Sequence, residues 1–516
     1  MKPPRTSLAL LLLAGACASG PAPKPGASAA DTRAAAVNAT TAPPEVKADF
    51  WVGRTDLIKA PPPPKPEALA LPKLERFELP NGLEVLVVAR KDLPVVSFGL
   101  AVQAGGYDET RDTLGVSDFV AAMLRRGTKT RSADDISQAI DFVGGSLDAE
   151  ATNESTTAGC SVLSKDAKLC LDLLSDILLR PSFPESEMSE VRDQMLAGVA
   201  SRYDNPHALA NAHFDNMLFG EKHPEGWVLT ADDVKKITRA RLEAFWKTFY
   251  RPNHAILAVA GDVDAAHLRV EVTRAFGAWS RREAPARPGW TVAAPLRTHI
   301  LLVDRPDLTQ ATIVLGQPGI AHADPRFYAA TLVNYVLGGS DFSSRLMTEV
   351  RAKRGLTYGI GSSFGASRYQ GAFRVLASTK NQTTWEALLA TINELRRMKA
   401  DGPTQPELDK AKGYYAGSYP FNLQTAAGIA SALVAAEMHG LGESYVRELP
   451  VRLAAVDRAT AAAAARELLM PDDLDIVIVG KGDVVAPQLD KSGIPYERIG
   501  FKAPIDAAER AAAHPR

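Results

Sequence analysis

The segments YRPNHAILAVAGDVD (residues 250–264) and LMPDDLDIVIVGKGD (residues 469–483) share one plan. Each begins with a turn that contains proline, continues as an apolar strand and ends in glycine and aspartate. The prolines of the two turns, Pro252 and Pro471, are 471 − 252 = 219 residues apart. A repeat at such a distance predicts two similar folding units in one chain.

A second pair of landmarks has the same spacing. A helix with a regular apolar stripe precedes Glu187, and a similar helix precedes Glu407, which lies 407 − 187 = 220 residues further on. Apolar strands alternate with such amphipathic helices in both units, which predicts an α+β fold with sheets covered by helices. We expect domains over 71–281 and 298–490, a linker with three prolines over 282–297 and a C-terminal tail over 491–516.

The first 17 residues have the features of an export signal. Lys2 and Arg5 precede the apolar run Ser7–Ala16, which is too short for a permanent membrane span and is typical of a secretory signal. The small residues before Cys17 resemble a bacterial lipoprotein cleavage box, which implies that Cys17 carries a lipid. An ordinary cleaved signal with a chance cysteine is the alternative. Both predict an exported protein, and Ala18 favours the outer membrane, facing the periplasm.

Residues 18–70 are rich in alanine and proline and predict an extended tether between the anchor and the folded body. The formal net charge of −1 over 516 residues, without a dense basic run, argues against nucleic acid as a partner. The other two cysteines are Cys160, in a predicted strand, and Cys170, on the apolar stripe of the next helix. We expect two small buried hydrophobic residues there, with a disulfide as the alternative.

The segment LGVSDFVAAMLRRGT (residues 114–128) predicts a helix, because its apolar residues recur at helical spacing before Gly127. It resembles the zinc helix of the insulinase/pitrilysin family of metallopeptidases, whose frame is Gly-x-x-His-x-x-Glu-His-Met-x-x-x-Gly-Thr. Gly115, Met123, Gly127 and Thr128 match this frame without a gap. In such a helix two histidines on one face bind zinc and the glutamate polarises a water molecule.

The metal-binding residues of the frame are missing. Its His, Glu and His fall on Asp118, Ala121 and Ala122, and the family's third ligand, a glutamate on a later helix, falls on Gly198. We call these four residues the four ligand positions, although Ala121 stands where the family has the glutamate that polarises the water and not a metal ligand. They offer no imidazole and only one carboxylate, so we expect no metal and no other cofactor in this chain.

A second stretch, GGSDFSSRLMTEVRAKRGLTYGIGSSF (residues 338–364), resembles the segment in which the family places an arginine and a tyrosine seven residues apart. Here they are Arg351 and Tyr358, and 358 − 351 = 7. The resemblance implies that they grip the substrate backbone and stabilise the tetrahedral intermediate, as an oxyanion clamp does. The alternative is a surface arginine and a half-buried strand tyrosine. We expect Arg351 to end a helix, Gly355 to allow the turn and Tyr358 to begin a strand.

The resemblance implies a half-clamshell of two domains, each with a mostly antiparallel sheet flanked by helices. It also implies a function: a zinc-less, substrate-holding subunit of a two-chain zinc endopeptidase. Its partners would be a zinc-bearing insulinase-like subunit, an unfolded peptide and, through the lipid anchor, a membrane. A peptide-binding or scaffold lipoprotein without proteolytic activity is the rival hypothesis, and an autonomous peptidase is a distant third.

Overall fold

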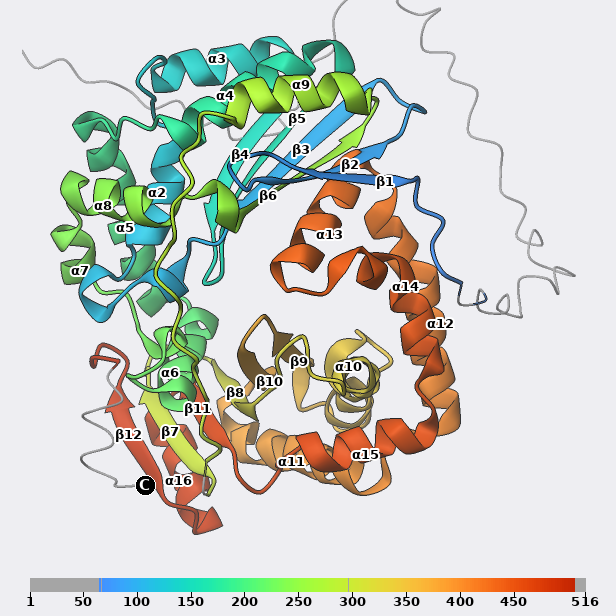
Figure 1. The fold of residues 1–516 in the computed structure, drawn as a ribbon. Helices are drawn as coiled ribbons and strands as arrows, with labels where there is room; N and C mark the ends of the chain where they lie inside the picture. The colour runs from blue at the N-terminus through green and yellow to red at the C-terminus, as the bar shows by residue number, and fades with distance from the viewer. Residues whose placement is uncertain (1–64, 66, 296, 506–516) are drawn as a thin grey trace, which may run out of the picture. The chain divides into compact units, whose positions relative to one another are not determined.

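We describe a computed structural model of the chain, which defines residues 65, 67–295 and 297–505. Two six-stranded sheets dominate it (Figure 1). The strand order is β1-β2-β6-β3-β5-β4 in the first sheet and β12-β7-β11-β8-β10-β9 in the second. All neighbours are antiparallel except the pairs β2–β6, β7–β11 and β7–β12. The predicted α+β fold with mostly antiparallel sheets is therefore confirmed.

The first sheet and its helices form what we call the N-terminal half. Its strands are β1 (Leu74–Glu78), β2 (Glu84–Ala89), β3 (Val95–Val102), β4 (Ser146–Ala151), β5 (Thr156–Leu163) and β6 (Ala255–Gly261). Its helices are α2 (Val116–Leu124), α3 (Ala133–Phe142), α4 (Ala167–Leu179), α5 (Glu185–Asp204), α6 (Pro206–Phe219), α7 (Ala231–Lys236), α8 (Arg239–Phe249) and α9 (Ala265–Phe276). Asn81 and Gly82 make the turn between β1 and β2, where Gly82 adopts the positive φ of 91° that favours glycine.

The second sheet and its helices form the C-terminal half. Its strands are β7 (His299–Asp304), β8 (Gln310–Pro318), β9 (Thr357–Ala366), β10 (Gln370–Lys380), β11 (Asp475–Gly480) and β12 (Tyr496–Gly500). Its α-helices are α10 (Phe327–Asn334), α11 (Thr384–Asp401), α12 (Gln405–Ser418), α13 (Ala426–Met438), α14 (Gly442–Ala455), α15 (Arg458–Leu468) and α16 (Gly482–Ser492). Two π-helical segments, η7 (Tyr335–Gly339) and η8 (Met347–Lys353), complete it.

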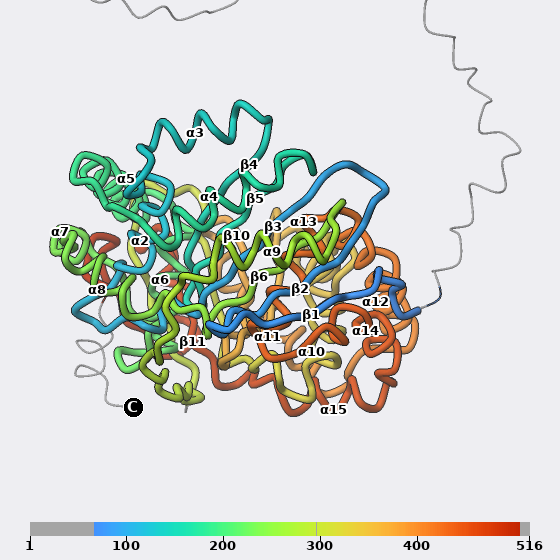
Figure 2. The backbone as a smooth tube through the Cα atoms, turned by 45° about the horizontal axis from the view of Figure 1, so that its top comes forward, coloured from blue at the N-terminus to red at the C-terminus, as the bar shows by residue number. Residues whose placement is uncertain are grey.

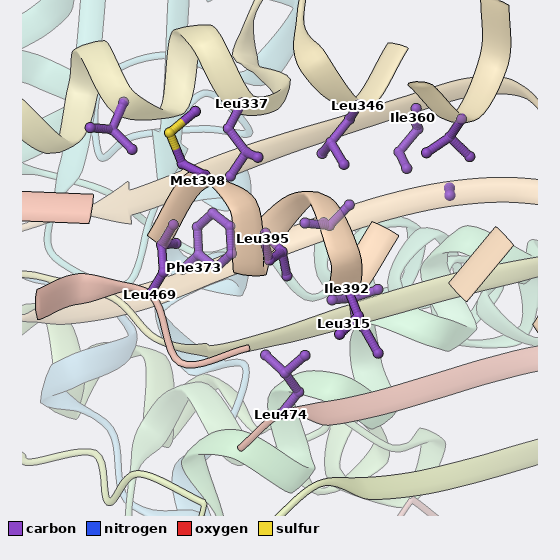
Figure 3. Packing of buried hydrophobic residues seen from close by; sticks show 14 of the residues in the cluster. Leu315, Leu337, Leu346, Ile360, Phe373, Ile392, Leu395, Met398, Leu469 and Leu474 are labelled. Atoms are coloured by element: carbon purple, nitrogen blue, oxygen red, sulfur yellow. The ribbon is translucent and has the colours of Figure 1, made fainter. Parts of the chain in front are cut away.

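Each half has its own apolar core on one face of its sheet. In the C-terminal half, Leu315 and Phe373 of the sheet pack with Leu395 and Met398 of α11, as Figure 3 shows. Leu337 and Leu346, from the segments on either side of the loop 340–345, belong to the same cluster. This core fixes the elements that carry Arg351 and Tyr358.

The opposite face of each sheet is covered by a helix from the other half. Helix α13 packs on β3 and β6, and helix α6 packs on β8 and β11. Figures 1 and 2 both show α13 beside the strands of the first sheet. The first residues of these helices, 206 and 426, differ by 426 − 206 = 220, so the duplicated units exchange equivalent helices. The two halves therefore share two apolar interfaces.

The linker is packed against both halves. Arg287 donates hydrogen bonds to Asp108 at 2.8 Å and to the Glu154 carbonyl at 2.6 Å. Trp290 stacks on Tyr107 with ring centroids 4.9 Å apart, and its ring meets that of Tyr369 edge-on at 5.2 Å. Side chains of the linker thus contact residues from both halves.

The C-terminal end adds a strand that the sequence did not predict. We expected a tail over 491–516, but residues 496–500 form β12, which pairs in parallel with β7. The segment is short and has no clear apolar alternation, so its pattern did not separate it from a tail. No helix within residues 65, 67–295 and 297–505 is long and apolar enough to cross a membrane. Cys17 and most of the predicted tether lie outside the described residues.

Candidate functional site

Helix α2 is held in place by its apolar face and its capped N-terminus. Phe119 and Met123 are buried in the core of the N-terminal half. The Glu109 carboxylate accepts hydrogen bonds from the backbone N–H groups of Gly115 at 3.0 Å and Ser117 at 2.6 Å. Burial raises the pKa of Glu109 to about 7, although these hydrogen bonds act in the opposite direction. The helix that resembles the zinc helix is therefore well defined.

The four ligand positions do not form a metal site. Asp118, Ala121 and Ala122 lie on α2, and Gly198 lies on α5, which packs against α2. A Cβ atom added at Gly198 would meet no other atom within 4 Å, so lack of space does not explain the glycine. Asp118 makes no hydrogen bond or ion pair within the described residues. Among all residues that the structure describes, no three His, Cys, Asp or Glu side chains are grouped so as to hold a metal.

A cavity of about 340 Å³ lies beside the degenerate motif. Asp118, Glu109, Asp215 and Glu225 line it together with Arg202. Burial raises the pKa of Asp118 and of Glu225, and it raises that of Asp215 to about 6 against the opposing effect of Arg374. The pKa shifts indicate a poorly solvated, acidic cavity, and Asp118 is the one ligand position among the residues that line it.

The structure brings Arg351 and Tyr358 together. Arg351 lies in η8, close to its end, Gly355 has the left-handed φ of 65°, and Tyr358 is the second residue of β9. The Arg351 Cζ atom lies 5.0 Å from the centroid of the Tyr358 ring. The helix, turn and strand expected around the pair are therefore present, whereas its catalytic role stays a prediction.

The start of β9 is fixed by hydrogen bonds to its neighbour β10. The Thr357 hydroxyl donates to the Ser378 carbonyl at 2.6 Å, and the Gly359 N–H donates to that hydroxyl at 3.1 Å. Tyr358 itself remains 83% exposed, so it is not the half-buried strand residue of the alternative interpretation. Its phenol is free to meet a ligand next to the Arg351 guanidinium.

Phe342 also contacts Arg351, and the sequence did not predict it as a site residue. It lies in the loop between η7 and η8, 76% exposed, with the centroid of its ring 4.9 Å from the Arg351 Cζ atom. The available signal was a lone aromatic residue among glycine, serine and aspartate in GGSDFSSR (residues 338–345). We call Phe342, Arg351 and Tyr358 the Arg351 cluster.

Cys160 and Cys170 form a disulfide, with Cα atoms 5.9 Å apart. The sequence favoured two unpaired buried residues, because spacing along the chain does not give the Cα separation. Both side chains are buried, so that part of the expectation is met.

Comparison with known proteins identifies the family. Residues 85–225 match the model described as insulinase, peptidase family M16, and residues 236–415 match the model described as the peptidase M16 inactive domain. An uncharacterized zinc protease of Streptomyces coelicolor is 31% identical over 402 residues, which are 77% of this chain and 87% of that protein. This chain belongs to the insulinase family.

Two further insulinase relatives and two solved structures agree with the fold. Uncharacterized zinc proteases of Mycobacterium tuberculosis and Mycobacterium leprae are 32% and 31% identical, over 73% and 68% of this chain and 86% and 79% of the relatives. The peptidase M16 inactive domain from Pseudomonas fluorescens has a TM-score of 0.74 at 28% identity, covering 79% of this chain and 98% of that chain. A protease from Helicobacter pylori, 20% identical, also has a TM-score of 0.74, covering 80% of this chain and all of that chain (100%).

The two matched ranges contain different groups of site residues. Asp118, Ala121, Ala122 and Gly198 fall in the segment that matches the insulinase model. Arg351 and Tyr358 fall in the segment that matches the inactive-domain model. An inactive-type insulinase chain without a zinc ligand set fits both matches.

Proposed function

We propose that this chain is the zinc-less, substrate-holding subunit of a two-chain insulinase-type endopeptidase. In this proposal a separate insulinase-family chain with an intact His-x-x-Glu-His motif carries the zinc, and this chain supplies Arg351 and Tyr358 as an oxyanion clamp. The substrate is an unfolded peptide. The observation that carries the proposal is the geometry of Arg351 and Tyr358, which present a cation and a phenol side by side.

The electrostatic surroundings of Arg351 support this role. Within the described residues its guanidinium makes no hydrogen bond and no ion pair, and Glu349, an acid of the same segment η8, pairs with Lys353. The N–H donors of Arg351 are therefore available to an oxygen atom of a bound peptide. A charged donor next to a phenol is suited to a carbonyl oxygen on which negative charge develops.

We further propose that the subunit is exported and held at the cell envelope by a lipid on Cys17. The lipid would lie in the outer membrane, and the protein would face the periplasm. The Cys160–Cys170 disulfide supports an oxidising compartment. A lipid anchor on a long tether would keep the folded body near the membrane while leaving it free to pair with a second chain.

The test is reconstitution with the partner. The full chain, tagged and purified from its own cells, is used to capture the zinc-bearing chain, and peptide cleavage is measured with each chain alone, with both, and with a chelator. We expect little cleavage by either chain alone, cleavage by the pair, and loss of cleavage with the chelator.

Variants then test the clamp. Arg351→Ala and Tyr358→Phe should each lower turnover, by up to about 10²–10³-fold if they act as oxyanion donors. The matched controls are Arg354→Ala, a neighbouring exposed arginine, and Tyr414→Phe, a tyrosine that is 51% exposed. Size exclusion checks that each variant still assembles.

The outcomes separate the hypotheses. If both clamp variants assemble and cleave at the wild-type rate, the pair is structural and the non-proteolytic, peptide-binding or scaffold role takes its place. If the zinc-bearing chain alone cleaves at the full rate, the shared site does not exist.

A further inference from the structure

The loop that carries Phe342 is anchored on both sides of this residue. The Ser340 N–H donates to the Tyr335 carbonyl at 3.1 Å, and the Ser340 and Ser343 hydroxyls are 3.1 Å apart. Arg345 forms two hydrogen bonds to the Glu407 carboxylate, at 2.8 and 2.7 Å. Phe342 is therefore presented to solvent by a fixed backbone, next to Arg351.

Arg351 is restrained by aromatic rings instead of by an acid. Its Cζ atom lies 4.9 Å from the Phe342 ring centroid and 5.0 Å from the Tyr358 ring centroid. A cation over a ring face is attracted by the ring's quadrupole. A carboxylate partner would hold the guanidinium equally well, but it would neutralise the charge and occupy the N–H donors. Ring faces leave those donors open.

Folding alone does not account for this arrangement. An arginine side chain has many rotamers, so an unpaired one on the surface loses entropy when it is held in one position. Phe342 is 76% exposed and gains little from burial. This arrangement is expected of a preorganised group that binds a ligand from solution.

We propose that Phe342 is a positioning residue of the clamp: it holds the Arg351 guanidinium over the start of β9 so that its donors point to a bound peptide. This inference rests on the proposed function for its catalytic consequence, whereas the positioning of Arg351 can be measured without the partner. Phe342 acts through Arg351 and makes no required contact with the reacting atoms.

The first experiment measures Arg351 itself in the purified full chain. Phenylglyoxal modifies accessible arginines, and mass spectrometry reads the rate at Arg351. Removing an exposed cation–π contact should raise the population of free guanidinium, and hence the rate, about two- to fivefold in Phe342→Ala. Phe342→Tyr should keep the wild-type rate, and Phe342→Leu, which has bulk but no ring face, should behave like the alanine variant. Phe142→Ala is the matched control, since Phe142 is 92% exposed on α3.

The second experiment uses the reconstituted pair. Phe342→Ala should lower kcat about two- to fivefold with little change in KM, and should have no further effect in an Arg351→Ala background. Unchanged thermal midpoints of the variants show that the fold is intact.

The outcomes of the two experiments test the positioning role of Phe342 separately from the clamp function. An unchanged Arg351 modification rate in Phe342→Ala, or rescue by leucine, overturns the inference. An additive loss of turnover in the Arg351→Ala background also overturns it, because Phe342 would then contact the substrate directly. If the modification rate rises but Arg351→Ala itself cleaves normally, the positioning contact is real and the proposed clamp function is what fails.

Discussion

Leu433→Ala should destabilise the N-terminal sheet although Leu433 belongs to the C-terminal half. Leu433 lies on α13, is 1% exposed and packs in the cluster that contains Leu86, Ala258 and Ala260 of the first sheet. A buried Leu→Ala change costs about 2–5 kcal/mol, through lost burial and the cavity that remains. Because α13 contributes to both halves, we expect the substitution to destabilise both sheets.

The magnitude is large compared with the stability of an ordinary protein. A loss of about 3 kcal/mol removes a large fraction of a typical free energy of unfolding of about 5–15 kcal/mol. With a urea m-value of about 3 kcal/mol/M, the upper value for small proteins, the midpoint falls by about 1 M. Leu218→Ala on α6, which is buried on the second sheet, should have a similar effect.

The assay is urea unfolding with the disulfide intact, followed by hydrogen exchange in β3 and β6 and separately in β8 and β11. The control is Leu389→Ala on α11, because Leu389 is 37% exposed. We expect one transition for both sheets in the wild type and in Leu433→Ala, at a lower urea concentration in the variant. If β3 and β6 keep their wild-type protection in Leu433→Ala, or if the wild-type sheets unfold at different urea concentrations, the exchanged helices do not couple the halves.

Three further predictions concern metal, pH and the anchor. The wild-type chain should bind no stoichiometric zinc by elemental analysis, whereas restoring His, Glu, His and Glu at the four ligand positions should yield about one zinc per chain, and a variant that keeps Gly198 should bind it more weakly. Asp176→Asn should lower the free energy of unfolding by about 1.5–3 kcal/mol at pH 7, because the buried carboxylate accepts hydrogen bonds from Arg131 at 2.6 Å and Arg180 at 2.7 Å, whereas the two arginines are partly exposed and stay solvated. Burial acts to raise the pKa of Asp176, but hydrogen bonds from Thr130, Thr128, Arg180 and Arg131 outweigh it, so the folded pKa is lowered. The stability due to this carboxylate is therefore present above the unfolded pKa and lost as pH falls through the folded pKa, and the gap between Asp176→Asn and wild type in urea unfolding should close on acidification. Cys17→Ser should release the protein from membranes and abolish acyl labelling, and a mutant that still fractionates with lipid and carries the label would contradict the predicted anchor.

Much of the fold was predictable because it depends on local periodicity. The duplication follows from apolar strands and stripes that recur 219 and 220 residues apart. The helix before Gly127 and the turn at Gly355 follow from residue types with strong local preferences, and Gly355 has the positive φ that such a turn requires. The degenerate ligand set was visible because the frame around it is intact.

The remainder depends on which surfaces meet, and periodicity does not contain that information. The apolar residues of α6 and α13 predict a buried face, but not that the face lies on the sheet of the other half. The Cys160–Cys170 disulfide depends on a Cα separation in space. Phe342 gives only a weak signal in the sequence, a lone aromatic residue among small and polar ones, because its contact is with a residue nine positions later, 351 − 342 = 9.

The two parts of the site differ in what keeps them in place. The helix that carries three of the four ligand positions includes Phe119 and the frame residue Met123, whose burial stabilises the N-terminal half whether or not zinc is bound. An intact frame with absent ligands is therefore expected of a chain that folds without binding metal. The Arg351 cluster is different, since Phe342 and Tyr358 are largely exposed and Arg351 has no acidic partner in the described part of the chain. Neither burial nor ion pairing explains this cluster, so its geometry is better explained by a ligand that it meets than by the fold that holds it.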